Sequence, residues 1–206
     1  MIGLVEAKKI CRIQEQIELT KQVDSNEWIK YLFEDQFLEE KLEIFKIINL
    51  DTAKNARVLD IGAGIGHFGS LCKHYGHEYL GTYFGRTSEQ LRPFFIDADL
   101  QHIEFGLFSR HGKNIPKGPW DRIVMIRTTF ELNAEWTIED WQELVNECLD
   151  NLAPGGQLLI KSNLSVEKKS KYGKLETQCQ ERMMAAFPDK APLPHTQWAT
   201  WHWIKE

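Results

Sequence analysis

The spacing of hydrophobic positions changes near residue 57. Before this point, apolar side chains recur every three or four residues, which predicts helices over residues 4–22 and 26–49. After it, short apolar runs of strand length alternate with segments of helical periodicity. Such alternation predicts a mostly parallel sheet with helices on both faces and a helical N-terminal extension. We therefore expect the extension over residues 1–50, packed on a main domain over residues 51–206.

The elements expected in the main domain follow one another along the chain. Strands are predicted over residues 57–61, 77–83, 101–107, 122–127 and 157–162, and helices over residues 66–74, 87–94, 138–151 and 167–186. The sequence APGG ends the helix over 138–151 before the next strand. The aromatic tail, with Trp198, Trp201 and Trp203, predicts a last strand whose rings pack in the core.

The start of the helix over residues 26–49 carries its own signals. Asp24 or Ser25 is the expected cap, and Glu27 lies in the first turn, where a carboxylate complements the helix dipole. Because the apolar stripe of this helix includes Trp28, we expect it to cover the mouth of a ligand site and help exclude water.

Composition narrows the class of protein. The 206 residues are 42% hydrophobic, enough for a globular domain with a full core. The net charge of −5 and the scattered basic residues disfavour a nucleic-acid partner. The four cysteines lie far apart without the spacing of a zinc site, so we expect buried thiols and no metal. No apolar stretch has the length of a signal peptide or membrane span, and we expect a cytoplasmic enzyme or binding protein without membrane contact.

The sequence RVLDIGAGIGHFG, residues 57–69, combines an acid with closely spaced glycines at the end of a predicted strand. In parallel sheets, ligands bind beyond the carboxyl ends of the strands. A tight turn without a ligand is one alternative. A dinucleotide site is another, but Gly64, Gly66 and Gly69 match its GxGxxG spacing two residues late. The frame that fits the strand end has Asp60 before the glycines, and a carboxylate there repels a pyrophosphate but suits a positively charged ligand.

Three motifs in order resemble the class I S-adenosylmethionine-dependent methyltransferases. VLDIGAGIG is similar to their glycine-rich first motif, WDRIVMI to their fourth strand, and LDNLAPGGQLLIKSN to their helix, turn and fifth strand. The resemblance implies a Rossmann-like, doubly wound fold and S-adenosyl-L-methionine as cofactor. It implies that Asp60 orients the loop and the methionine amino group, while Gly62, Ala63, Gly64 and Gly66 form the loop that passes beneath the cofactor.

The chain departs from the family pattern after its second and third strands. The family's ribose-binding acid is replaced by Tyr83, whose hydroxyl can bond a ribose, with Phe84 beside it. The acid after the third strand is replaced by Leu107 and Phe108, and Phe84 or Phe108 can flank the adenine. Arg127, at the end of the predicted fourth strand, completes the expected cofactor contacts.

Two residues are candidates for proton transfer. Glu131 follows the fourth strand and is either a general base or a solvated, helix-capping carboxylate. His67, beside the glycine loop, either contacts a carboxylate, deprotonates a substrate or is a surface histidine at a helix start.

The sequence predicts a methyltransferase acting on a small molecule or a metabolite-linked group. The rival from another class is a non-catalytic module that keeps the fold and binds a partner protein, favoured by the missing acids. An NAD-dependent oxidoreductase is disfavoured by the glycine frame and by the lack of an acid at Tyr83. No oligomeric state is predicted.

Overall fold

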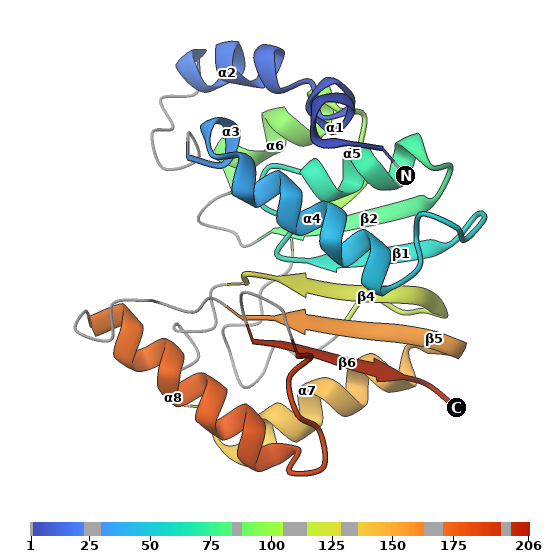
Figure 1. Ribbon diagram of the computed structural model, residues 1–206, viewed down its shortest axis with the longest axis vertical. Coiled ribbons are helices and arrows are strands. Elements are labelled where there is room, and N and C mark those ends of the chain that lie inside the picture. The colour runs from blue at the N-terminus through green and yellow to red at the C-terminus, as the bar shows by residue number, and fades with distance from the viewer. Residues whose placement is uncertain are drawn as a thin grey trace. The chain divides into compact units, whose positions relative to one another are not determined.

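The chain forms two compact units, residues 1–105 and 106–206, in a computed structural model. The structure describes residues 2–22, 30–83, 88–104, 115–128, 136–162, 171–194 and 199–206. Each unit has its own part of the sheet, flanked by helices (Figure 1). The predicted division of the chain at residue 50 stays a prediction, and helices from before that point lie in the same unit as the first three strands.

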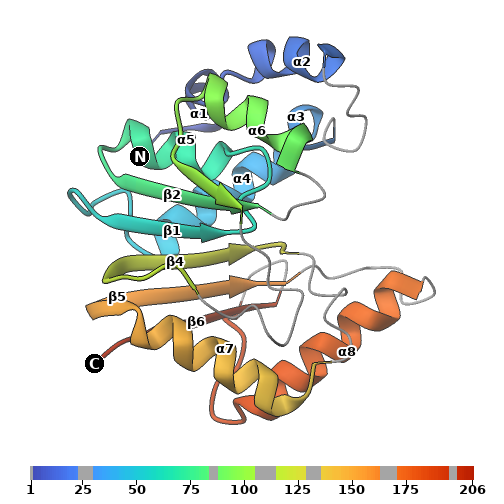
Figure 2. The ribbon, with the colours of Figure 1, turned by 180° about the vertical axis from the view of Figure 1, so that it is seen from behind.

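The first unit is built on three parallel strands. Its elements are α1 (Leu4–Ile10), α2 (Ile13–Gln22), α3 (Lys30–Phe33), α4 (Asp35–Ile47), β1 (Arg57–Ile61), α5 (His67–His74), β2 (Glu78–Tyr83), α6 (Ser88–Asp97) and β3 (His102–Glu104). The strands lie in the order β3-β2-β1. Helix α4 lies toward the viewer in Figure 1, and α6 does so in the reverse view of Figure 2. The predicted parallel strands are thus confirmed, with β3 shorter in its described part.

The two long N-terminal helices are each interrupted, whereas the hydrophobic pattern predicts continuous helices. Arg12 has a φ of 49°, in the left-handed region, and separates α1 from α2. Its guanidinium donates a hydrogen bond of 2.9 Å to the backbone oxygen of Asp97 at the end of α6, which holds the kink in place. Glu34, in an extended conformation, separates α3 from α4. The predicted caps of the second helix lie outside the described residues.

The second unit contains β4 (Trp120–Ile126), α7 (Ile138–Asp150), β5 (Leu152–Lys161), α8 (Lys171–Ala186) and β6 (Thr200–Ile204). The strands lie in the order β4-β5-β6, with β4 parallel and β6 antiparallel to β5. The predicted last strand is confirmed for its described part. Trp201 and Trp203 are buried in it as expected, and Trp198 lies outside the described residues.

Helix α7 begins at a capping box. Thr137 accepts a hydrogen bond from the backbone N–H of Asp140, and the Asp140 side chain accepts one from the backbone N–H of Thr137. The helix ends near its predicted limit, but β5 begins at Leu152, five residues before the predicted start at 157. The sequence APGG therefore lies within the extended segment.

The predicted burial of the cysteines is confirmed, because all four are free thiols and buried. Among the described residues, no helix is both long and apolar enough to cross a membrane. The same part of the chain contains no group of three or more histidine, cysteine or acidic side chains placed to hold a metal ion.

Candidate functional site

The turn between β1 and α5 adopts a conformation that depends on glycine. Gly62, Gly64 and Gly66 have φ values of 82°, 58° and 82°. These are left-handed conformations, which residues with a Cβ rarely adopt. The closely spaced glycines that identify this loop in the sequence are therefore required by its left-handed backbone conformations.

Thr82 of β2 holds the first half of the loop. Its hydroxyl accepts a hydrogen bond of 3.1 Å from the Gly62 N–H, and its carbonyl oxygen accepts one of 2.9 Å from the Ala63 N–H. A further bond of 3.1 Å from the Gly66 N–H to the Ala63 oxygen closes the turn. Thr82 is fully buried, so the neighbouring strand fixes the start of the loop.

The middle of the loop leaves room for a ligand. A Cβ added to Gly64 would meet no atom of the described residues within 4 Å. At Gly66 an added Cβ would instead lie 2.9 Å from a methyl carbon of Leu100. Gly66 thus serves packing, whereas Gly64 presents bare backbone to open space, where a ligand can approach closely.

Asp60 places a buried carboxylate directly before the loop. It is 2% exposed, and its Oδ2 accepts a hydrogen bond of 3.0 Å from the Tyr79 hydroxyl. Its Oδ1 is buried and has no hydrogen-bond partner among the described residues. Burial raises the pKa of Asp60 to about 6, opposed by the Tyr79 hydrogen bond and the charge of Lys41. A cationic ligand group that donated to Oδ1 would satisfy this oxygen and favour the ionised form.

Two further glycines make room for the ring of Tyr79. A Cβ added to Gly69 would lie 2.5 Å from a Tyr79 ring carbon. One added to Gly81 would lie 2.8 Å from the Tyr79 hydroxyl and 2.6 Å from a ring carbon of Phe95. Gly69, which completed the late dinucleotide spacing in the sequence, therefore has a packing role here.

His67, a candidate for proton transfer, is a buried residue. It is 1% exposed, and its Nε2 lies 2.7 Å from the Oε1 of Gln16 in α2. Burial, with a smaller effect from Lys41, lowers the pKa of His67 to about 3. The alternative of a surface histidine is wrong, because His67 is buried and contacts Gln16 of α2. A neutral imidazole with so low a pKa is also a poor base near pH 7.

Tyr83 lies at the end of β2, as predicted, with its ring turned into the unit. The ring centroid is 5.8 Å from that of Phe95 and 5.5 Å from that of His102. Its ring therefore contributes to packing, and its predicted contact with a ribose stays a prediction.

Arg127 directly follows β4 and has a φ of 51°. Its backbone N–H donates a hydrogen bond of 2.9 Å to the oxygen of Lys161 at the end of β5. The four remaining candidates, Phe84, Leu107, Phe108 and Glu131, lie outside the described residues. Their predicted roles are neither supported nor opposed.

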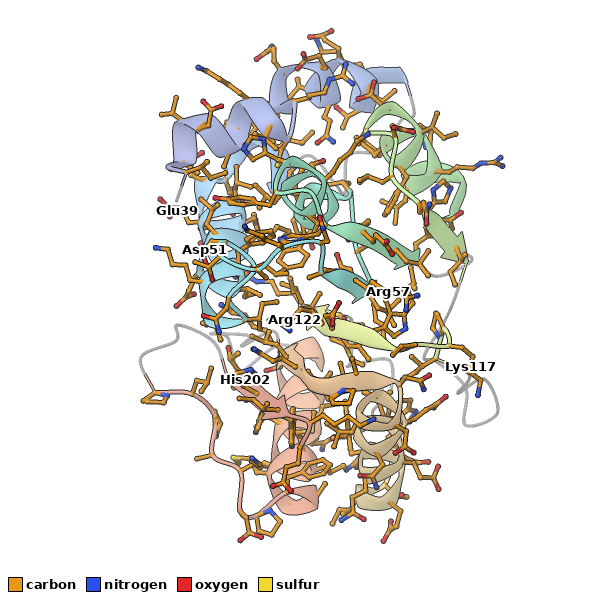
Figure 3. All side chains as sticks on the ribbon, turned by 90° about the vertical axis from the view of Figure 1, so that its right-hand side faces the viewer. Glu39, Asp51, Arg57, Lys117, Arg122 and His202 are labelled. Atoms are coloured by element: carbon orange, nitrogen blue, oxygen red, sulfur yellow. The ribbon has the colours of Figure 1, made fainter. Side chains whose placement is uncertain are left out.

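His202, a second histidine whose pKa is lowered, lies in the sheet of the second unit. His202 of β6 and Arg122 of β4 are labelled in Figure 3. Burial lowers the pKa of His202, and the charges of Arg122 and Lys190 lower it further. Its Nε2 lies 2.9 Å from the Oε1 of Gln157 in β5, so a contact within the sheet explains the position of this side chain.

Three residues that shape the site were not predicted from the sequence. Tyr79 and Thr82 belong to a predicted strand, and Gln16 to a predicted helix, so each was assigned only to its element. One signal was present in the sequence of β2. A threonine at a buried position of a strand, next to a loop, commonly forms a hydrogen bond with backbone groups. The position of Gln16 depends on the kink at Arg12, which no local signal indicates.

Comparison with known proteins identifies the family. A family model described as "Methyltransferase domain" matches residues 28–203. The chain belongs to this family. No curated protein sequence matches the chain.

Solved structures resemble the chain in fold. A Nostoc punctiforme protein assigned as an O-methyltransferase has a TM-score of 0.56 and 15% identity over 86% of this chain and 60% of its own. TrmN from Thermus thermophilus has a TM-score of 0.54 and 12% identity over 81% and 48%. A methyltransferase from Pyrococcus furiosus has a TM-score of 0.50 and 16% identity over 80% and 82%. The predicted Rossmann-like fold is confirmed, and the chain spans about half to three fifths of the length of the first two proteins.

The residues of the loop fit S-adenosylmethionine, the cofactor that the family resemblance implies. S-adenosylmethionine carries an ammonium group, and Asp60 offers a buried carboxylate oxygen without a partner among the described residues. Gly64 offers open backbone beside it in the same loop. Asp60 and the glycines are therefore the residues that would hold it.

Proposed function

We propose that this protein transfers the methyl group of S-adenosylmethionine to a small molecule or a metabolite-linked group. The observation that carries the proposal is the buried Oδ1 of Asp60, which lacks a partner among the described residues and precedes a glycine loop with open space at Gly64. The net charge of −5 supports an acceptor other than a nucleic acid. Free, buried cysteines agree with action in the reducing cytoplasm.

The protein's own contribution is binding and orientation. When bound, the cofactor supplies an electrophilic methyl group on a positively charged sulfur. Asp60 would orient the amino end, and the backbone at Gly64 would fix the distance to the loop. Holding the methyl group in line with an acceptor atom and away from water accounts for much of such a rate enhancement. Glu131 stays the proposed general base, and burial, which lowers the pKa of His67, supports Glu131 over that residue in the role.

A non-catalytic module is the second candidate function. It is favoured by Tyr83, which stands where the family usually has an acid and whose ring packs against Phe95 and His102. A module of this kind would keep the fold and bind a partner protein, with weak cofactor binding or none.

Calorimetric titrations with S-adenosylmethionine, S-adenosylhomocysteine and NAD separate these possibilities. The proposal expects the first two ligands to bind with micromolar or better affinity and NAD not to bind. Binding of neither sulfur compound would favour the non-catalytic module, and binding of NAD alone would favour an oxidoreductase.

A matched pair of glycine variants locates the site. Gly64 and Gly76 both have positive φ values, 58° and 78°, and a Cβ added to either meets no described atom within 4 Å. Gly64→Val and Gly76→Val should therefore lose similar stability, about 1–2 kcal/mol each. Only Gly64→Val should abolish binding of S-adenosylhomocysteine. Equal binding by both variants would show that the loop is not the site.

A further inference from the structure

Two residues of the N-terminal segment, one in α2 and one between α1 and α2, contact the residue that follows the glycine loop. His67 is the first residue of α5 and comes directly after Gly66. Gln16 of α2 lies with its Oε1 2.7 Å from the His67 Nε2, and the thiol of Cys11 donates to the His67 backbone oxygen at 3.6 Å. The end of the loop is thereby attached to the extension before the first strand.

The other end of the loop is attached to β2. Thr82 accepts hydrogen bonds from the N–H groups of Gly62 and Ala63. Between the two attachments, Gly64 has no side chain and no described atom near its Cβ direction. Its position therefore depends on how firmly the two ends are held.

The contact between Gln16 and His67 is directional and buried. Both side chains are 1% exposed. Because burial lowers the pKa of His67, the ring is neutral near pH 7, and its Nε2–H can donate to the amide oxygen of Gln16. The Nε2 of Gln16 has no partner among the described residues, a cost that an apolar pair would avoid. In return, the polar pair provides a directional contact that an apolar pair would lack.

Helix α2 is itself fixed to the unit. Arg12, in its left-handed conformation, directs its guanidinium to the end of α6. The Nη1 atom lies 2.9 Å from the Asp97 backbone oxygen and 3.1 Å from the Asp97 carboxylate. Gln16 therefore projects from a helix that is held in place a turn earlier.

We infer that Gln16 is a positioning residue of the cofactor loop, acting through its hydrogen bond to His67. The inference rests on the proposed function, because it concerns binding of S-adenosylmethionine by that loop. The N-terminal extension then contributes to cofactor affinity through one side chain, in addition to any role as a cover.

Substitution of Gln16 tests the inference by affinity. Gln16→Met keeps the length of the side chain and removes the hydrogen bond. We expect S-adenosylhomocysteine to bind about three- to tenfold more weakly, the effect of one neutral hydrogen bond. The control is Gln142→Met, which removes a 3.1 Å bond to the Ala186 oxygen in the second unit and should leave affinity unchanged. Equal affinity of Gln16→Met and wild type, or an equal loss in both variants, would overturn the inference.

A double-mutant cycle separates positioning from general destabilisation. If Gln16 acts through His67, adding Gln16→Met to His67→Phe should not weaken binding further, whereas independent effects would add and contradict the inference.

Should Gln16→Met fail to fold, hydrogen exchange of the wild type decides the question. Residues 13–20 should exchange more slowly with S-adenosylhomocysteine bound, and unchanged exchange refutes the link. A wild type that binds no S-adenosylhomocysteine refutes the proposed function and this inference with it. A wild type that binds, with an unaffected Gln16 variant, refutes the inference alone.

Discussion

Replacement of Asp60 by asparagine should stabilise the unliganded protein while weakening cofactor binding. Burial raises the Asp60 pKa from its ordinary 3.8 to about 6. Each pKa unit corresponds to about 1.4 kcal/mol, so ionised Asp60 lowers the free energy of unfolding by about 3 kcal/mol at neutral pH. Asparagine carries no charge, and its amide oxygen can still accept the hydrogen bond from Tyr79. Asp60→Asn should recover most of this free energy.

The stability gained by Asp60→Asn should increase with pH. Because the native pKa lies above the unfolded one, the native state holds the proton between about pH 4 and 6, and wild-type stability from this group is lost as the pH rises through that window. Urea unfolding should show the advantage of Asp60→Asn growing from below about 1 kcal/mol at pH 4 to about 3 kcal/mol at pH 7.5. Asp99→Asn is the control: Lys73 lowers the pKa of this exposed carboxyl, so no such growth is expected.

Ligand binding should change in the opposite direction. A hydrogen bond between charged groups is worth about 1.5–3 kcal/mol, so Asp60→Asn should bind S-adenosylhomocysteine at least about tenfold more weakly at pH 7.5. Wild-type affinity should also fall as the pH decreases below about 6, because the carboxylate becomes protonated. Unchanged affinity in the variant, or a stability difference that does not vary with pH, would refute the role given to Asp60.

Three other predictions concern single elements. Tyr83→Phe keeps the packing on Phe95 and should cost up to about tenfold in affinity for S-adenosylhomocysteine, whereas Tyr83→Asp should preserve or improve it; calorimetry that finds no change in Tyr83→Phe would place the ribose elsewhere. Hydrogen exchange over residues 30–47 should slow when the cofactor binds, and unchanged exchange would leave α3 and α4 as packing helices only. Thr137→Ala removes the capping box of α7 and should lower the free energy of urea unfolding by about 1 kcal/mol, more than any loss in Thr52→Ala.

Much of the fold could be predicted because its signals are local. The apolar runs predicted β1, β2, β4 and β5, and the glycines after β1 indicated a loop at that strand end, which the structure contains at Gly62, Gly64 and Gly66. The break between α1 and α2 could not be predicted in this way. It depends on a hydrogen bond from Arg12 to Asp97, a residue 85 positions away.

The site was predicted in part for the same reason. Asp60 and Gly64 are recognisable because their spacing serves the turn in which they lie. His67 was a candidate base in the sequence, and only tertiary structure shows that Gln16 buries it and that its pKa falls. Local spacing identifies the loop, whereas burial and charge depend on helices that are distant in the chain.

The space that Gly69 and Gly81 leave for Tyr79 limits how this sequence can diverge. A methyl group at either glycine would collide with the ring, and a smaller residue at 79 would open a cavity and remove a hydrogen-bond donor from Asp60. Each single replacement is therefore costly. A larger side chain at 69 or 81 needs a smaller residue at 79, and also a shift of Leu100 or Phe95, which lie 2.9 Å and 2.6 Å from the added Cβ atoms. These three positions should tolerate substitution only in combination. A library that varies one position at a time would therefore find each of them intolerant of substitution.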